Sequence, residues 1–434
     1  MKNYMKKAAI LVMIMTLISK TLGFGRDVIL SYFYGASYIT DAYLISQTIP
    51  NVLFGFIGTA IVTAYIPIES KIESSLGIEA GNRYTSNLIN IVLVLVLLIF
   101  AFSFIFSREI VKVFASGFHG EVFDMTVNFT RISLFGIFFI ALFAIYSGFL
   151  QIKGDFLTPA FTGIPFNVVI IASIALSSKL GTGVLLYGTL IATVFQLIVM
   201  FPSAKKLGFR YQKFIDFKDD NIKETLAVMY PVIFGASINQ INVLIDRSIA
   251  SSVSVGGISA LNYASKLNLF VQGIFVLSIV SVIYPKMARY SANGNIEALK
   301  RTVTKTIKII CIFVIPTTII FMAFSEPIIK LMFGRGAFDY DAIKMSSSAL
   351  FFYSIGMVGM GIREVLARAF YSLQDTKTPV INATVGVFIN IVLNIILSKY
   401  LGVGGLALAT SISALVTAAL MFVSFKKIEK WCCI

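Results

Sequence analysis

The stretch 86–107 reads SNLINIVLVLVLLIFAFSFIFS and contains no charged residue. A helix needs roughly 20 apolar residues to cross the hydrocarbon core of a bilayer, so this stretch predicts a transmembrane helix. About twelve stretches of this kind fill the chain. Of its 434 residues, 57% are hydrophobic and 13% are charged, against about 25% charged in soluble proteins. We therefore predict an all-α polytopic membrane protein.

The first predicted span follows a short basic N-terminus. Its apolar run starts at Ala8 and extends to about Ser31, which is longer than the apolar core of a signal peptide. We therefore expect the run to remain in the protein as a membrane helix. The predicted spans are 7–34, 39–68, 86–107, 124–152, 158–178, 183–204, 222–252, 257–285, 302–324, 345–372, 378–398 and 403–425.

The net charge of +15 would suit a nucleic-acid-binding protein, but the positions of the basic residues indicate a membrane protein. If the N-terminus is cytoplasmic, most Lys and Arg residues between the spans lie on the cytoplasmic side. The positive-inside rule then predicts that both termini are cytoplasmic. We expect the lipid bilayer as a partner of the chain, and no nucleic acid.

The longest connection between predicted spans is basic and lies in the middle of the chain. It covers 205–221 and includes Lys205, Lys206 and Lys213. It separates an N-terminal lobe, 1–204, from a C-terminal lobe with a short basic tail, 222–434, and each lobe has six predicted helices.

Motifs of the first lobe recur in the second. Asp155 with Thr158-Pro159 corresponds to Asp375 with Thr378-Pro379, about 220 residues later. An even number of crossings makes the lobes parallel, so we expect a pseudo-twofold axis along the membrane normal. Substrate sites in such transporters lie between the repeats, near the midplane. The alternative is a duplication that survives only for packing.

Three cations lie within predicted spans, where an ionised group costs at least about 2.5 kcal/mol on insertion scales. They are Lys20 and Arg26 in the first half and Lys266 in the second. Gly23 and Gly25 separate Lys20 from Arg26, and a bend at these glycines would bring both cations into one cavity. Three cations lining a cavity suit an anionic headgroup such as a pyrophosphate.

Two acidic residues accompany these cations. Asp27 follows Arg26 directly, and Asp41 lies in the second predicted span. We expect both carboxylates to pair with the cations or tune them, because intramembrane ions are functional by default. The alternative is that Arg26 and Asp27 lie near the interface and reach water.

A second polar group points to an ion site. Asn390 and Asn394 are four residues apart and share one face of a helix. With Asp246 and the hydroxyl of Thr410 they would form an all-oxygen site for Na⁺, a hard cation. The alternative role for the asparagines is hydrogen bonding between helices.

Residues for enzymatic chemistry are scarce. The chain has one histidine, His119, and three cysteines without the spacing of a metal site. Asp339-Tyr-Asp341 is a D-x-D pair of the kind that binds a metal in glycosyltransferases, but its loop is typical of a solvated turn. We predict no enzyme, no catalytic residue, and no cofactor or metal apart from Na⁺ as a candidate coupling ion.

Six motifs connect the chain with a known family. They are Leu22-Gly-Phe-Gly-Arg-Asp27, Thr40-Asp-Ala42, Ile49-Pro-Asn-Val-Leu53, Gly148-Phe-Leu-Gln-Ile-Lys-Gly-Asp155, Asn262-Tyr-Ala-Ser-Lys-Leu267 and Asp375-Thr-Lys-Thr-Pro379. In these motifs the chain resembles the MurJ/MviN family of lipid II flippases, within the larger group of multidrug, oligosaccharidyl-lipid and polysaccharide exporters. The likeness covers nearly the whole chain.

The resemblance implies a V-shaped, two-lobed transporter in the bacterial cytoplasmic membrane. It implies alternating access that moves lipid II, an undecaprenyl-pyrophosphate-linked peptidoglycan precursor, outward, with cell-wall synthesis proteins as candidate partners. The family's pyrophosphate-contacting cations correspond to Lys20, Arg26 and Lys266, and its acidic residue in the second helix corresponds to Asp41. The family's Na⁺ site corresponds to Asp246, Asn390, Asn394 and Thr410.

The chain departs from the family pattern in three places. Lys20 and Lys266 replace arginines, Phe54-Gly55 replaces basic residues, and about twelve helices are predicted where the family has fourteen. Lysine keeps the charge but lacks the bidentate fork of arginine. The alternatives are therefore a flippase for another polyprenyl-linked polysaccharide unit, a multidrug exporter, and a non-transporting scaffold for envelope synthesis.

Overall fold

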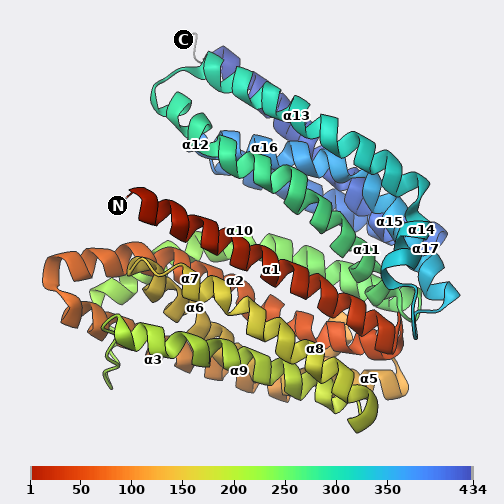
Figure 1. Ribbon diagram of the computed structural model, residues 1–434, viewed down its shortest axis with the longest axis horizontal. Coiled ribbons are helices and arrows are strands. Elements are labelled where there is room, and N and C mark those ends of the chain that lie inside the picture. Colours follow the sequence, from red (N-terminus) through yellow and green to blue (C-terminus); the bar gives the residue numbers. More distant parts are fainter. Residues whose placement is uncertain (1, 432–434) are drawn as a thin grey trace. The chain divides into compact units, whose positions relative to one another are not determined.

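The computed structural model describes residues 2–431, including their side chains except at 2–9, 238, 239 and 428–431. Within this range the chain forms helices joined by short connections, and no β-strand (Figure 1). The first helices are α1 (Lys2–Tyr34), α2 (Tyr38–Leu76), α3 (Ile78–Ile105), α4 (Ser107–Phe114), α5 (Gly120–Leu134), α6 (Gly136–Ile152), α7 (Leu157–Phe161), α8 (Gly163–Leu180) and α9 (Gly183–Lys206). The others are α10 (Asp220–Val253), α11 (Gly257–Val271), the π-helix η1 (Gln272–Leu277), α12 (Ser278–Ala292), α13 (Ile296–Ala323), α14 (Ser325–Phe333), α15 (Tyr340–Ile355), α16 (Met357–Ser372) and α17 (Lys377–Trp431).

The helices form two compact units. Unit 1 consists of Met1–Tyr34 and Tyr38–Gln240, and unit 2 consists of Gly35–Ser37 and Ile241–Ile434. Each unit has its own apolar core, with Tyr65 and Phe149 buried in the first and Phe370 in the second. The division into lobes 1–204 and 222–434 joined by the connection 205–221 stays a prediction.

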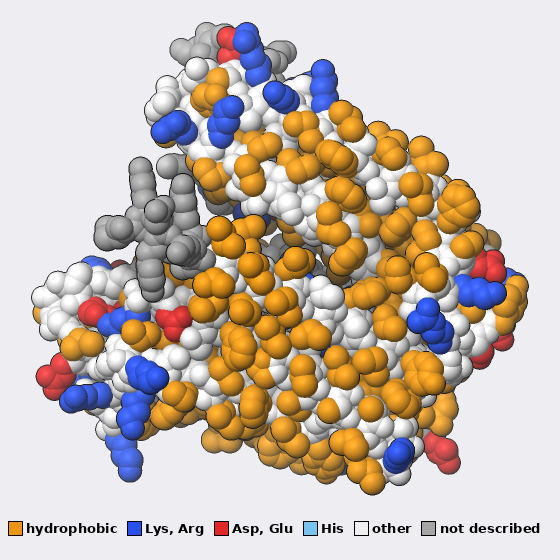
Figure 2. Space-filling view, in the orientation of Figure 1, with side chains coloured by type: hydrophobic (Ala, Val, Ile, Leu, Met, Phe, Trp, Pro, Cys, Tyr) orange, Lys and Arg blue, Asp and Glu red, His pale blue; other side chains and the backbone are white. Residues whose placement is uncertain are grey.

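Long apolar helices confirm the prediction of an all-α multi-pass membrane protein. Among the described residues nine helices are long and apolar enough to cross a membrane, or ten if α15 and α16, bent by 45°, form one span. On the face of unit 1 shown in Figure 2, apolar side chains cover the middle of the helices and charged side chains gather toward their ends. The predicted number of about twelve spans stays a prediction.

Helix α17 contains two of the predicted spans, 378–398 and 403–425. Its backbone leaves helical geometry at Gly402, with φ of 56° and ψ of −132°, a conformation that glycine adopts readily and other residues rarely. The two parts fold back on each other, because Ser413 Oγ donates to Gly386 O at 2.6 Å. Residues far apart in α17 are therefore brought to one level.

Several other predicted spans are interrupted. The span 124–152 is broken at Phe135, between α5 and α6, and 158–178 is broken at Thr162, between α7 and α8. Helices also extend past the predicted ends: α3 begins at Ile78 rather than at 86. The reason is that hydropathy reports where the chain enters an apolar medium, whereas helix bounds follow backbone hydrogen bonds.

Helices α8 and α9 approach each other closely at Gly188. A Cβ atom at Gly188 would lie 1.8 Å from Ser173 Oγ and 2.1 Å from Ser173 Cβ. Small residues at such contacts let membrane helices pack tightly, which is a main source of their association.

Alanine at position 188 is therefore expected to destabilise unit 1 by about 1–3 kcal/mol through overpacking. The matched control is Gly136→Ala, because a Cβ at Gly136 meets nothing within 4 Å and helical alanine is favoured over glycine. Thermal unfolding in detergent measures both variants. Adding Ser173→Gly should restore the stability of Gly188→Ala, and equal melting temperatures for the two single variants would contradict the close contact.

The repeated Asp-x-x-Thr-Pro motif has the same local structure in both places. Asp155 Oδ1 accepts from the Thr158 N–H at 3.0 Å, and Asp375 Oδ1 accepts from the Thr378 N–H at 2.9 Å. In each motif the threonine hydroxyl donates to the other carboxylate oxygen at 2.6 Å. The motif thus begins a helix, α7 or α17, by satisfying its first N–H groups.

Replacing Asp375 by alanine is expected to cost about 1 kcal/mol of stability through loss of this cap. Partial burial disfavours the carboxylate, but hydrogen bonds from Thr378 and Lys377 lower the pKa of Asp375 below its ordinary value. A lowered folded-state pKa makes the stabilisation complete above a pH of about 4 and lost as the pH falls through the folded pKa. Melting temperatures of wild type and Asp375→Ala should therefore differ at pH 7 and converge in acid, and a constant difference would contradict the cap.

Candidate functional site

The first group of predicted site residues lies on α1, which packs along α8. Asn167 Nδ2 on α8 donates to Ser19 O at 3.2 Å, and its side chain lies against Gly23. Helix α1 is continuous from Lys2 to Tyr34, so the expected bend at Gly23 and Gly25 is wrong. The glycine at position 23 instead leaves room for the side chain of Asn167.

Arg26 and Asp27 form an ion pair on α1. Arg26 Nη2 and Nε lie 3.0 and 3.2 Å from Asp27 Oδ1. The Arg26 side chain is 23% exposed and that of Asp27 5%. Because Nε and Nη2 both contact one carboxylate oxygen, the guanidinium keeps its Nη1 donors for a phosphate oxygen. A half-buried guanidinium next to a carboxylate is a strong candidate for binding an anionic group.

The other predicted site residues of unit 1 differ in exposure. Asp41 lies in the first turn of α2 and is fully buried, whereas Lys20 on α1 is exposed. On a continuous helix Lys20 and Arg26, six residues apart, point about 120° away from each other. Nearby, Tyr43 Oη and Thr189 Oγ1 lie 2.9 Å apart and connect α2 to α9. Lys266, the third predicted cation, lies half-buried on α11 in unit 2.

The predicted ion-site residues come together in unit 2. Asn394 Nδ2 donates to Asp246 Oδ1, which connects α17 with α10. The amide group of Asn390 lies 2.8 Å from the Asn394 amide and 3.2 Å from Thr410 Oγ1. The fold of α17 at Gly402 explains why Asn390 and Thr410 are neighbours despite their separation in sequence.

One member of this cluster was missed in the sequence. Asn242 on α10 donates to Asp246 Oδ2 at 3.4 Å, and its Oδ1 lies 2.8 Å from the Asn390 amide. Asn242 precedes Asp246 by four residues and therefore shares its helix face. The same spacing rule that identified Asn390 and Asn394 would have found it.

The donor set of this cluster fits a hard monovalent cation. Every side chain in it offers a carboxylate, amide or hydroxyl oxygen, the ligands that hard cations prefer. Asn394 is buried and its Oδ1 has no hydrogen-bond partner in the described part of the chain. By contrast, residues 2–431 hold no group of three His, Cys, Asp or Glu side chains placed to bind a metal.

The D-x-D pair has a structural role at one position. Asp339 precedes α15, and its Oδ1 accepts from the Ala342 N–H at 2.8 Å. This is an N-cap, in which the carboxylate satisfies one of the first N–H groups of a helix.

Comparison with protein families and curated proteins gives one consistent result. The family model described as "Lipid II flippase MurJ" matches residues 30–431. The "Probable lipid II flippase MurJ" of Buchnera aphidicola subsp. Baizongia pistaciae is 29% identical over 426 residues, which cover 96% of this chain and 82% of that protein. The protein of the same description from Vibrio cholerae is also 29% identical, over 434 residues, with the same coverage.

Solved structures agree. "Lipid II flippase MurJ, inward closed conformation" matches with a TM-score of 0.85 and 30% identity, over 96% of this chain and 87% of that chain. A multidrug resistance MATE family transporter of the MOP superfamily, in an inward-facing conformation, matches with a TM-score of 0.80 over 96% of this chain and 97% of that chain. At 14% identity the second match concerns the fold alone. The chain therefore belongs to the MurJ family of lipid II flippases.

Proposed function

We propose that this protein moves lipid II across the bacterial cytoplasmic membrane by alternating access, as a transporter and not as an enzyme. The observation that carries the proposal is the Arg26–Asp27 pair, a half-buried guanidinium on a helix of a MurJ family member. Keeping a charge in such a place is costly, and its usual justification is a ligand or an ion pathway. A pyrophosphate is the part of lipid II that a guanidinium recognises best.

Within this proposal Arg26, Lys20 and Lys266 hold the pyrophosphate. Arg26 supplies planar donors, and the two lysines supply compact charges without a bidentate fork. Asp27 orients the guanidinium through the contacts of 3.0 and 3.2 Å, and the buried Asp41 adds a second carboxylate in unit 1. Both termini lie on the cytoplasmic side, as the positive-inside rule predicts.

The cluster of Asp246, Asn242, Asn390, Asn394 and Thr410 is proposed to bind Na⁺ as the coupling ion. The unpartnered Oδ1 of Asn394 and the carboxylate of Asp246 are the oxygens that a cation would satisfy. The ion would supply positive charge between α10 and the two parts of α17, and its binding would thereby favour one arrangement of these helices.

The proposal is tested by reconstitution. Purified protein in liposomes containing fluorescent lipid II should move the label between leaflets, measured as loss of protection from a membrane-impermeant quencher. Liposomes with unlabelled lipid II in excess should slow the signal. Flipping no faster than in protein-free liposomes, under an inward or an outward Na⁺ gradient, would contradict the proposal.

A second candidate is a flippase for another polyprenyl-pyrophosphate-linked saccharide. Lysine at positions 20 and 266 favours it, because a lysine reads phosphate as a point charge and imposes less geometry than arginine. In the same liposomes, competition by a polyprenyl pyrophosphate carrying a different saccharide distinguishes the two. Stronger competition by that lipid than by lipid II would favour the second candidate.

A further inference from the structure

The connection between α9 and α10 is attached along one side of α3 by side-chain hydrogen bonds to its backbone. Asn82 Nδ2 donates to Gly208 O at 2.9 Å, and Asn90 Nδ2 donates to Phe214 O at 2.8 Å. Between them, Asn87 donates to Asp216 O at 2.9 Å and accepts from the Asp216 N–H at 2.7 Å. An extended segment satisfied in this way holds its side chains in fixed directions.

The side chains of this connection alternate between two faces. Phe214 is half-buried, and the Arg83 guanidinium lies 4.1 Å from the centre of its ring. Tyr211, Lys213 and Ile215 are exposed on the other face. Tyrosine and lysine together are typical of the headgroup layer of a membrane, where an apolar body and a polar tip are both satisfied.

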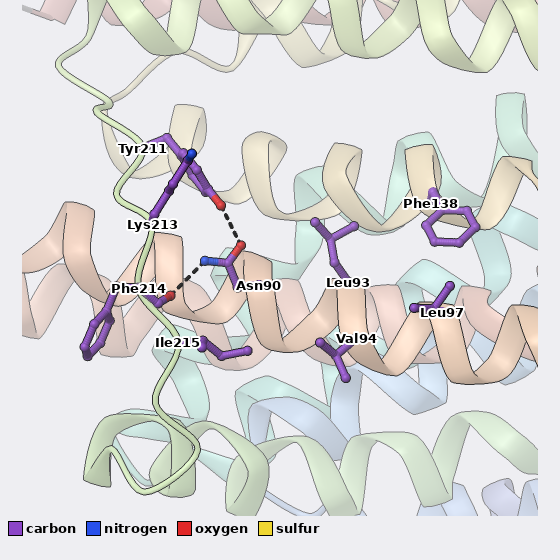
Figure 3. A pocket seen from close by; sticks show the side chains of 9 residues that line it. All are labelled: Asn90, Leu93, Val94, Leu97, Phe138, Tyr211, Lys213, Phe214 and Ile215. Carbon is purple, nitrogen blue, oxygen red and sulfur yellow. Dashed lines mark hydrogen bonds between the residues drawn. The ribbon is translucent and has the colours of Figure 1, made fainter.

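A cavity of about 690 Å³ lies between this connection, α3 and α6. One end is polar and is formed by Tyr211, Lys213 and Asn90, with Tyr211 Oη donating to Asn90 Oδ1 at 2.8 Å (Figure 3). The other end is apolar and is formed by Leu97 and Phe138 (Figure 3). The residues that line the cavity include a lysine and no acidic side chain.

The polar end and the apolar end occupy different depths of the predicted membrane. Asn90 lies near the start of the uncharged stretch 86–107, next to the basic connection, and Leu97 lies in its middle. Leu97 is 54% exposed on a helix long and apolar enough to cross a membrane. The cavity therefore runs from the headgroup layer into the acyl-chain layer.

We propose that this cavity binds an anionic phospholipid of the adjacent leaflet, with the phosphate at Lys213 and an acyl chain along Leu97 and Phe138. The ammonium group attracts the negative headgroup, and the hydrogen bond between Tyr211 and Asn90 fixes the polar rim beside it. The volume is within the range of cavities that enclose small ligands. Because the bound lipid would contact α3, α6 and the connection at once, it would hold the connection on unit 1.

Native mass spectrometry of the delipidated protein, titrated with phosphatidylglycerol or phosphatidylcholine, tests the proposal. A basic residue near a membrane surface contributes about fivefold in affinity for anionic lipid, so we expect at least fivefold tighter binding of phosphatidylglycerol. Lys213→Gln should remove this preference. Lys218→Gln is the matched control, because Lys218 is an exposed lysine of the same connection outside the cavity. Equal losses in both variants would mean diffuse surface charge and would overturn the proposal.

A second pair of variants tests the apolar end. Leu97→Trp should fill the cavity and weaken the binding of both lipids, whereas Leu98→Trp, next to it and 62% exposed, should not. Equal affinity of the wild type for the two lipids, or no difference between the tryptophan variants, would mean that only unselective boundary lipid binds. The lipid II flipping assay is a separate readout, so failure of this proposal leaves the transport proposal untouched.

Discussion

Replacing Arg26 by alanine is expected to reduce lipid II flipping at least about 30-fold while the protein still folds. Truncating one partner of a buried charged contact costs about 2 kcal/mol or more, which corresponds to that factor. The variant would lose the only guanidinium among the three proposed pyrophosphate ligands. The measurement is the initial rate of quencher accessibility in proteoliposomes, at equal amounts of reconstituted protein.

The stability of the Arg26→Ala variant has to be separated from its transport. Asp27, 4% exposed, would lose its contact with the guanidinium and destabilise the variant. Arg26→Ala combined with Asp27→Asn should recover melting temperature without recovering flipping. Arg301→Ala, which removes an arginine that is 79% exposed, should flip at the wild-type rate. Wild-type flipping by Arg26→Ala would refute the assignment of this residue to the headgroup.

Replacing Asp246 by asparagine is expected to abolish the dependence of transport on Na⁺. The side chain keeps its shape but loses the single negative charge of the cluster, and a cation among neutral oxygens alone is held weakly. In wild type, Na⁺ at ten times its Kd should stabilise the folded protein by about 1.4 kcal/mol, and this effect should vanish in the variant. Melting temperatures in NaCl and in choline chloride at equal ionic strength measure it.

The matched control for Asp246→Asn is Asp341→Asn, which makes the same chemical change in the first turn of α15, outside the cluster. This control should keep the full response to Na⁺. Asn242→Ala should weaken the response, because its Oδ1 lies 2.8 Å from the Asn390 amide. A wild-type protein whose stability and flipping rate are both insensitive to Na⁺ would exclude the ion site.

Much of the architecture was predictable because the bilayer imposes one simple rule on sequence. The uncharged stretch 86–107 could only satisfy its backbone in an apolar medium by forming a helix, and α3 does so. The i, i+4 spacing of Asn390 and Asn394 likewise placed both on one face, and the structure brings them to Asp246. Local spacing therefore predicted part of the candidate ion site.

Other features were outside the reach of local patterns. The glycines at 23 and 25 predicted a bend, but close packing of α1 against Asn167 on α8 keeps the helix continuous. The attachment of the connection to α3 depends on Asn82 and Asn90 facing a segment more than a hundred residues later. Nothing in the spacing of either partner indicates the other.

The amino-acid sequence by itself determined that this protein is an all-α membrane transporter of one family, since hydropathy and motifs are properties of contiguous residues. The tertiary structure alone decided which distant polar groups meet. The turn at Gly402 brings Thr410 beside Asn390, and the packing of α10 adds Asp246 and Asn242. Such contacts depend on how helices pack side by side, and packing is set by the shapes of many side chains together.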